Sequence, residues 1–272
     1  MITEPGVYQM SSDVYHADSA LSSSGARKLL PPYCPALFKW HRENQQPPSR
    51  VFDFGHAAHK MVLGDGPEIA VIDAKDYRTK VAQDARDEAR ADGKIPMLDH
   101  EVETALAMAS VLQGTRMFRQ PGKPEQSLFA RDEATGVMLR ARIDWLPESV
   151  DGRMTIVDYK TTVCAEPGAF GRSAARYRYD QQAAFYVDIV KALGLAEHVD
   201  FVFVAQEKSA PYLVQPFRIE EYELAIGRRR NREAIELFAR CVEADDWPSY
   251  SAGVETLSLP AWMDDEEMVI DG

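Results

Sequence analysis

The sequence predicts an α/β (α+β) fold in which helices flank a central mixed sheet. Three consecutive strand patterns with short turns between them occupy residues 126–161, and two more strands follow near residues 199–205 and 212–219. Segments with the 3.6-residue hydrophobic repeat of helices lie on both sides of these strands in the chain. At 272 residues and 45% hydrophobic content, the chain can bury a substantial core.

The first half of the chain is expected to be mostly helical. Four helices are predicted, over residues 26–30, 54–63, 74–92 and 100–118. Ser22, Ser23 and Ser24 precede the first of them and supply an N-cap. The same hydroxyls and the amides at the helix start are also suited to a phosphate, although capping alone explains them. Residues 1–20 are interpreted as an extended leader.

The second half of the chain changes to a two-residue hydrophobic alternation. Strands are predicted over residues 126–130, 137–146, 154–161, 199–205 and 212–219, and helices over residues 180–193 and 220–243. The turns at residues 134–136 and 149–152 make the first three strands an antiparallel meander. We expect one catalytic domain over residues 1–243, made of an N-terminal segment (1–50), a helical part (51–120) and a part with the sheet (121–243), followed by an acidic tail (244–272).

The net charge of −12 is unusual for a protein that binds nucleic acid. Nine acidic residues and no Lys or Arg lie from Glu243 onward, so the tail accounts for most of this excess. Basic residues gather in four short runs, at 27–28, 39–42, 172–178 and 228–232. These runs are enough to line a groove, or each is simply a solvated helix face.

The sequence also argues against membrane and disulfide-bonded classes. No apolar run approaches the roughly 20 residues of a spanning helix, and the N-terminus lacks a basic segment followed by an apolar one. Cys34, Cys164 and Cys241 are an odd number and far apart, which disfavours a disulfide framework, a zinc site or an iron–sulfur cluster. We therefore expect a cytoplasmic protein.

Two carboxylates and a lysine on adjacent strands are the main candidate catalytic residues in the sequence. Asp158 and Lys160 are two residues apart in a strand, so their side chains point to the same face. The preceding strand can place Asp144 beside Asp158, and two such close carboxylates repel unless a cation lies between them. A metal-dependent phosphodiesterase needs this arrangement, whereas an isolated Asp-x-Lys is usually a surface ion pair.

Further residues have both a functional and a structural interpretation. Each is expected near the same face of the sheet: Gly55 and His59, Glu125, Gln182 and Tyr186, Arg140 and Arg142. Gly55 is interpreted as allowing a close helix approach, and His59 as a metal ligand or a buried core histidine, with His56 and Lys60 as alternatives. Glu125 can approach the metal or remain solvated. The other residues can contact DNA, pack against the sheet or pair with carboxylates.

These residues form an ordered set of motifs that resembles a known nuclease superfamily. In chain order they are Gly55-x-x-x-His59, Arg142-x-Asp144, Asp158-x-Lys160-Thr161 and Gln182-x-x-x-Tyr186. The set is similar to the RecB-type branch of the PD-(D/E)xK nucleases. The runs 21–25 and 179–186 bring it closer to the RecE, or exonuclease VIII, family of phage and prophage nucleases. The similarity covers about residues 1–225.

The resemblance implies a Mg²⁺-dependent exonuclease, with Mn²⁺ as a second supporting ion. Such an enzyme digests linear duplex DNA from 5′ to 3′ in a bacterial host cell and leaves 3′ single strands for recombination by a RecT-like annealing protein. It also implies a homo-oligomeric ring, with a tetramer favoured over a trimer. The implied metal ligands are His59, Asp144, Asp158 and the Tyr159 carbonyl; the implied catalytic residues are Asp144, Asp158, Lys160, Gln182, Tyr186 and Glu125; the implied DNA contacts are Ser22, Ser24, Arg27, Arg140, Arg142 and Thr161.

The resemblance gives roles to some of these side chains. Lys160 would position the attacking water and help to deprotonate it, and Gln182 with Tyr186 would steady Lys160 or the DNA strand. Two other functions are compatible with the residues. One is a DNA- or protein-binding module that has kept the nuclease fold without its chemistry. The other is an unrelated metal hydrolase that acts on small phosphoesters.

Overall fold

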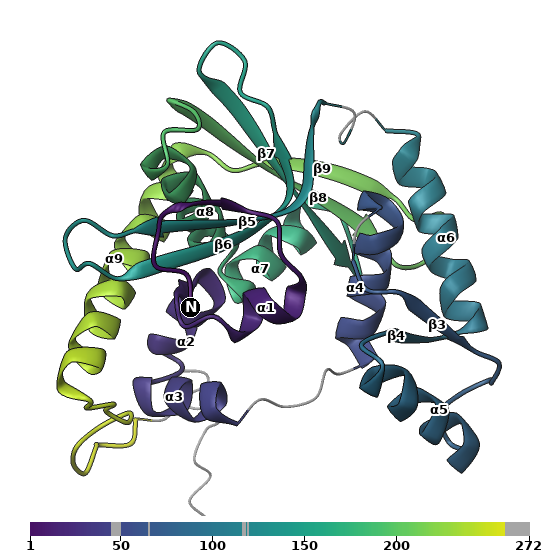
Figure 1. Cartoon of the computed structure of the whole chain (residues 1–272), viewed down its shortest axis with the longest axis horizontal. Coiled ribbons are helices and arrows are strands. Elements are labelled where there is room, and N and C mark those ends of the chain that lie inside the picture. The colour runs from purple at the N-terminus through teal and green to yellow at the C-terminus, as the bar shows by residue number, and fades with distance from the viewer. Residues whose placement is uncertain (45–49, 65, 116–117, 119, 259–272) are drawn as a thin grey trace, which may run out of the picture.

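A mixed β-sheet forms the centre of the protein in the computed structural model, which describes residues 1–44, 50–64, 66–115, 118 and 120–258. Within these residues, seven strands form one sheet, in the order β1-β5-β6-β7-β8-β9 with β2 beside β6. The strands are β1 (Gly6–Tyr8), β2 (Leu21–Ser22), β5 (Gly122–Arg131), β6 (Met138–Pro147), β7 (Arg153–Thr162), β8 (His198–Glu207) and β9 (Val214–Arg218). Two pairs, β2–β6 and β7–β8, are parallel and the others are antiparallel. The predicted mixed sheet flanked by helices is confirmed (Figure 1).

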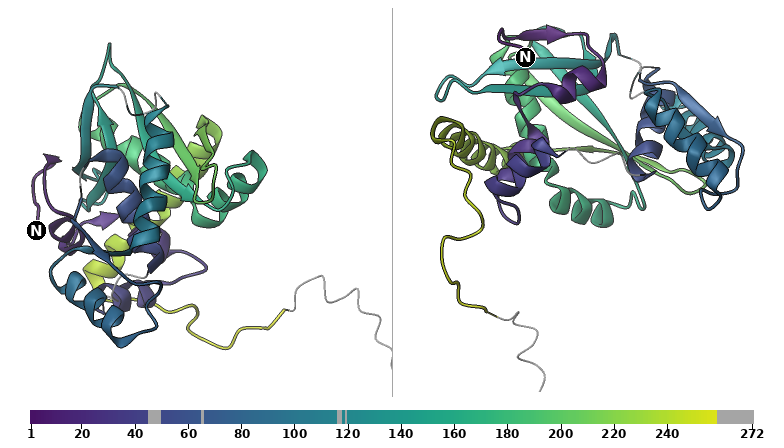
Figure 2. Two further views of the ribbon diagram at one scale, coloured as in Figure 1. Left: turned by 90° about the vertical axis from the view of Figure 1, so that its right-hand side faces the viewer. Right: turned by 60° about the horizontal axis from the view of Figure 1, so that its bottom comes forward.

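Helices cover both faces of this sheet. They are α1 (Ser12–Ala17), α2 (Ser23–Leu29), α3 (Pro35–Glu43), α4 (Arg50–Leu63), α5 (Lys80–Ala91), α6 (Asp99–Gln113), α7 (Pro167–Tyr177), α8 (Tyr179–Ala192) and α9 (Glu221–Ala244). A second, two-stranded parallel sheet joins β3 (Ile69–Ile72) to β4 (Ile95–Leu98). Figures 1 and 2 show α4, α5 and α6 beside the main sheet, at the end opposite to α9.

The alternation of residues in β7 decides which helix each side chain meets. Ile156 packs in the large core that contains α8 and α9, whereas Val157 and Tyr159 pack with Ala58 of α4 and Leu112 of α6. Asp158 and Lys160 share the parity of Ile156 and therefore face α8. The predicted parity of this strand is correct, and it brings both charged residues to a helix-covered face.

The adjacent strands β6 and β7 pair at one position, near the end of β6 and the middle of β7. Their ladder consists of the single pair Trp145 and Val157, although both strands are described over ten residues. Farther along, β6 instead pairs with β2 through Leu139 and Arg140. The two strands therefore form a fork, and backbone groups inside the fork are free to bind side chains.

Several predictions for the N-terminal half are wrong. Residues 1–20 are not an extended leader, because β1 adds an edge strand to β5 and α1 follows it. The predicted helix over residues 74–92 begins only at Lys80, and it lies between β3 and β4, which were not predicted. Helix α7 was also missed. Within the predicted helix 100–118, residues 116 and 117 lie outside the described residues, as does the tail from residue 259.

Other predictions agree with the structure. Ser22 is the N-cap of α2, and its hydroxyl accepts a hydrogen bond from the Gly25 amide at 3.1 Å. The meander of β5, β6 and β7 and the helices α8 and α9 begin and end within a few residues of their predicted bounds. Among the described residues, no helix has the length and apolar character needed to cross a membrane.

Candidate active site

The fork between β6 and β7 places two aspartates at its opening. One step from the Trp145–Val157 pair, the same antiparallel register sets Asp144 opposite Asp158. Asp144 Oδ2 accepts a hydrogen bond of 2.8 Å from the Tyr159 amide, so the carboxylate occupies the position of a missing ladder bond. The side chains of Asp144 and Asp158 are only 13% and 2% exposed. The two acids are therefore adjacent and largely removed from water.

Asp158 has its own set of partners on the α8 side. Lys160 Nζ lies 2.5 Å from Asp158 Oδ2, and Gln182 Nε2 donates a hydrogen bond of 2.8 Å to Asp158 Oδ1. Tyr186 is buried one turn farther along α8 and shares a hydrogen bond with Gln182. The structure thus brings these four predicted residues together, with Gln182 contacting Asp158 and not Lys160.

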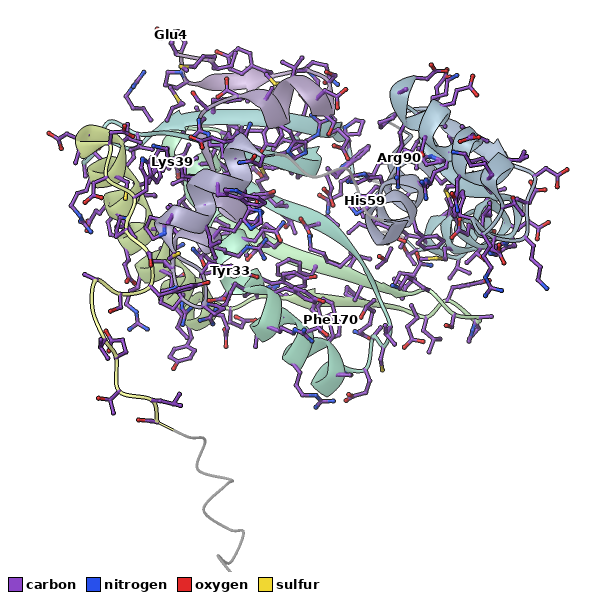
Figure 3. The ribbon with its side chains drawn as sticks, turned by 90° about the horizontal axis from the view of Figure 1, so that it is seen from below. Glu4, Tyr33, Lys39, His59, Arg90 and Phe170 are labelled. Carbon is purple, nitrogen blue, oxygen red and sulfur yellow. The ribbon has the colours of Figure 1, made fainter. Side chains whose placement is uncertain are left out.

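Asp144 belongs to a second cluster on the α4 side. Ligand atoms of His59, Glu125 and Asp144 all lie within 4.8 Å of one another. His59 Nδ1 is 3.6 Å from Asp144 Oδ2, and the imidazole also hydrogen bonds to the Tyr159 backbone. Figure 3 shows His59 at the junction of the sheet and the helical part. The cluster joins α4, β5 and β6 at one point.

Backbone strain places Glu125 in this cluster. The β5–β6 register sets Glu125 opposite Asp144, between the paired residues Pro124 and Gln126, and its φ is +51°. A non-glycine residue rarely adopts this left-handed conformation, which costs about 1–3 kcal/mol and often occurs at functional sites. Arg142 holds the side chain through a 2.5 Å ion pair with Glu125 Oε2. The sequence predicted Glu125 at the start of this strand. In the structure it lies inside β5.

The electrostatics follow from this burial. Burial raises the pKa of Asp144 well above its usual value, and the neighbouring Asp158 raises it further. Burial also raises the pKa of Asp158, although Lys160 opposes the effect. The pKa of Lys160 is raised because the attraction of both aspartates outweighs the loss of water. Burial lowers the pKa of His59 to about 3, so its imidazole is neutral at physiological pH.

The donor set fits a divalent cation. Mn²⁺ accepts two carboxylates together with a neutral imidazole as ligands. Mg²⁺ binds mainly to the carboxylate oxygens of such a set. Both oxygens of the buried Asp158 carboxylate have partners, because Oδ1 accepts from Gln182 and Oδ2 pairs with Lys160. A cation near Asp144 would remove the unfavourable repulsion that now raises its pKa. His59, Glu125 and Asp144 would hold the ion, with Asp158 next to it.

The predicted DNA contacts fall into two groups. Ser22, Ser24 and Arg140 line a cavity of about 230 Å³, together with the basic residues Lys28 and Arg42. Arg140 is 9% exposed, and two of its buried guanidinium nitrogens, Nε and Nη1, have no hydrogen-bond partner within the described residues. The exposed side chains of Lys28 and Arg42, with the buried charge of Arg140 behind them, make this cavity suited to a phosphate group.

The remaining predicted contacts have structural partners. Arg142 binds Glu125 and the Met10 carbonyl, and Arg27 donates to the Tyr177 carbonyl. Thr161 lies on the opposite face of β7 from Lys160 and pairs with Gln206 in the ladder. The roles of these three residues in DNA binding stay predictions.

Two features of the site were not predicted correctly. Gly55 does not allow a close approach, because a Cβ built there meets nothing within 4 Å. Tyr179 was not singled out, yet its ring centroid lies 5.2 Å from Lys160 Nζ. Tyr179 begins α8 three residues before Gln182, so both side chains lie on one face of the helix. This spacing could have predicted the contact.

Comparisons with known proteins are consistent with this geometry. The profile of a family described as "PDDEXK-like domain of unknown function (DUF3799)" matches residues 22–260. The crystal structure of a "Putative exonuclease" from Eubacterium rectale superposes with a TM-score of 0.60 at 14% identity, covering 96% of this chain and 100% of that one. The crystal structure of a phage related exonuclease from Haemophilus somnus 129PT is also found, with a TM-score of 0.33 at 11% identity and coverage of 84% and 96%. No curated protein matches the chain.

Proposed function

The chain belongs to the family of PDDEXK-like domains, and from this premise we propose that it is a metal-dependent exodeoxyribonuclease acting on linear double-stranded DNA. The observation that carries the proposal is the buried pair Asp144 and Asp158 with Lys160 beside it, at the fork of β6 and β7. Crowded buried carboxylates destabilise a fold unless they serve a cation, so a purely structural role does not explain them. The basic cavity around Arg140 supports a polyanionic substrate.

The residues of the site have separable tasks in this proposal. A bound Mg²⁺ would lower the pKa of a water and neutralise charge on the phosphate. His59, Glu125 and Asp144 hold the ion, and Tyr159 keeps Asp144 in place through its amide. Arg142 fixes the direction of the Glu125 carboxylate. These contacts prepare the ligands before substrate arrives.

Lys160 acts as a cation in this mechanism. The attraction of Asp158 and Asp144 raises its pKa and favours the ammonium form, so Lys160 donates hydrogen bonds to the attacking water or to a phosphate oxygen. Asp158 orients the ammonium, and Gln182 orients Asp158. Charge-assisted donors of this kind stabilise negative charge that develops in the transition state.

The finer features of the proposal come from the family resemblance. We propose digestion from 5′ to 3′, which leaves a 3′ single strand for a RecT-like annealing protein. We also propose a homo-oligomeric ring, a tetramer in preference to a trimer, with a basic channel and an acidic exterior. The ring would explain how a chain with a net charge of −12 binds DNA.

One incubation tests the activity and its finer features together. Linear duplex DNA is labelled separately at each 5′ end and internally and is incubated with the protein and Mg²⁺, with and without EDTA. We expect early release of the 5′ labels, late release of the internal label, and no release with EDTA. Cleavage of nucleotides but not of DNA would instead indicate a small-phosphoester hydrolase. Binding without cleavage, and no heat on titration with Mn²⁺, would indicate an inactive binding module.

A further inference from the structure

A row of aromatic rings leads from Lys160 to the protein surface. Lys160 Nζ lies 5.2 Å from the ring centroid of Tyr179 and 5.9 Å from that of Phe203. Tyr179 stacks with Phe203, with centroids 5.1 Å apart, and with Tyr177, with centroids 6.0 Å apart and an angle of 25°. The rings therefore form a continuous stack whose inner end contacts the candidate catalytic lysine.

The outer ring of this stack is open to solvent. Tyr177 is 51% exposed, although its inner face is covered by Tyr179. Tyr33, which precedes α3, is also exposed. An exposed aromatic face next to a buried catalytic group offers a surface on which another flat ring can stack.

Contacts from three elements hold Tyr177 in position. It is the last residue of α7, and its carbonyl accepts a hydrogen bond from the Arg27 guanidinium of α2. The next residue, Arg178, has a left-handed conformation with φ of +58° and joins α7 directly to α8. These contacts fix the backbone of Tyr177, and the stacking on Tyr179 orients its ring, so the side chain loses little conformational entropy when it binds a ligand.

The charge around the stack favours nucleic acid as the ligand. The Arg176 guanidinium lies 5.9 Å from the centroid of Tyr177, and Arg172 is exposed on the same helix. Aromatic rings flanked by arginines bind single-stranded nucleic acid without sequence preference, because every base has a flat face. A DNA strand held by its phosphate at Lys160 would bring a base to this position.

We propose that Tyr177 is a positioning residue that stacks on a nucleobase of the cleaved strand, next to the phosphodiester at Lys160. The inference rests on the proposed function, since it assumes that DNA is the substrate. Tyr177 touches neither Asp144 nor Asp158 in any contact of the described residues, so its effect is on substrate placement and not on the chemistry itself.

The test combines variants of the protein with variants of the DNA. Tyr177→Ala removes the ring, Tyr177→Phe retains it, and Tyr222→Ala is the matched control, because Tyr222 is 75% exposed on α9. The DNA is a linear duplex with one abasic nucleotide placed at successive positions from either end. Steady-state initial rates of cleavage with the DNA in excess give KM and kcat, and fluorescence anisotropy in EDTA gives affinity without cleavage.

We expect Tyr177→Ala to raise KM about tenfold with a smaller change in kcat, as the loss of one stacked base predicts. Tyr177→Phe and Tyr222→Ala should behave as the wild type. When the abasic nucleotide lies at one particular position, the wild-type protein should bind that DNA about tenfold more weakly than intact DNA. Tyr177→Ala should bind the same abasic DNA and intact DNA equally well. The inference would be overturned if the affinity losses caused by Tyr177→Ala and by the abasic nucleotide multiplied at every position. It would also be overturned if the KM of Tyr177→Ala equalled that of the wild type.

The two proposals fail in different ways in this experiment. Wild-type protein that binds the duplexes in EDTA but never cleaves them would refute the nuclease activity and leave the stacking comparison intact. Wild-type cleavage with no coupling between Tyr177 and any base would refute the stacking alone, and Tyr177 would then be a packing residue. A failure both to bind these DNAs in EDTA and to cleave them with Mg²⁺ would overturn both.

Discussion

At the scale of single residues, Asp144 lies in an environment that disfavours its ionised form in the metal-free protein. Its pKa is raised by burial and by Asp158, while the unfolded chain has the ordinary value near 3.8. The stability that this residue contributes is therefore fully present below pH 3.8 and is lost as the pH rises through its higher folded pKa. Asp144 therefore contributes less to the stability of the fold at neutral pH than at low pH, because the folded site disfavours its ionised form.

The variant Asp144→Asn should separate stability from activity. The amide keeps an oxygen for the Tyr159 amide but carries no charge, so we expect the melting temperature at pH 7 to rise by a few degrees and the gain to vanish toward pH 4. DNA cleavage should be abolished. Calorimetric melting over this pH range checks the change in stability, and a nuclease assay checks the loss of cleavage. A lower melting temperature at pH 7 would contradict the assigned electrostatics.

Binding of the metal should release protons. A carboxylate with a raised pKa is partly protonated before the ion binds, and the ion must displace that proton. Titration with Mn²⁺ near pH 6, in buffers of different ionisation enthalpy, should show proton release in the wild type and much less in Asp144→Asn. The affinity of the wild type should increase with pH. Equal heats in all buffers would show that metal binding does not release a proton from Asp144.

Lys160 should affect turnover and not metal binding. It contacts Asp158 but does not belong to the cluster of His59, Glu125 and Asp144. Lys160→Ala should lower kcat by about 10²–10³-fold, the usual cost of losing one donor to developing negative charge, while the Mn²⁺ affinity changes little. Parallel activity and calorimetric measurements test this. Equal losses in both would mean that Lys160 acts mainly by holding Asp158 in place.

At the scale of secondary-structure elements, the site depends on how closely α8 approaches α9. A Cβ built on Gly227 of α9 would collide with the Asp180 carbonyl and would lie 2.9 Å from Ala184 Cβ. Helix α8 carries Gln182 and Tyr186, so a shift of α8 moves both away from Asp158. The absence of a side chain at residue 227 therefore helps to build the site.

Gly227→Ala should lower both stability and activity. Overpacking of this kind costs about 1–3 kcal/mol, and the displaced α8 should weaken cleavage more than binding of DNA. Gly171→Ala is the control, because Gly171 lies in α7 with nothing within 4 Å of a built Cβ, and alanine favours a helix. Chemical denaturation and the nuclease assay compare the two variants. Equal stability of both would show that α9 can move without cost.

The elements also show what the sequence could predict. Strand alternation predicted that Asp144 and Asp158 share a face, because a short hairpin fixes the register locally. It could not predict β1, whose partner Phe129 is far away in the chain, or β3 and β4, whose four-residue strands are too short for a clear period. Gly168 and Gly171 weakened the helical signal of α7. The left-handed backbone of Glu125 and its contact with Arg142 have no local signature at all.

At the scale of the whole molecule, the question is how an acidic chain binds DNA. Several basic residues are already neutralised: Arg228 pairs with Asp188 and Glu221, and Arg232 with Asp132. These ion pairs make Arg228 and Arg232 less available to the predicted groove. The cations around the cavity at Arg140 are a different case, because Lys28 is exposed there and Arg42 binds only a carbonyl oxygen among its described hydrogen bonds.

The salt dependence of DNA binding should therefore come mainly from this cavity. Each lysine or arginine that neutralises a phosphate steepens the fall of the binding constant with salt by about one unit in a plot of log K against log salt. Lys28→Ala should lower the slope by about one unit, and Lys191→Ala, at the exposed end of α8, should leave it unchanged. Affinities measured between about 50 and 200 mM salt, in EDTA to prevent cleavage, give both slopes. If Lys191→Ala changed the slope as much as Lys28→Ala, DNA would bind through the general surface charge, and the cavity at Arg140 would have no special part in holding the strand.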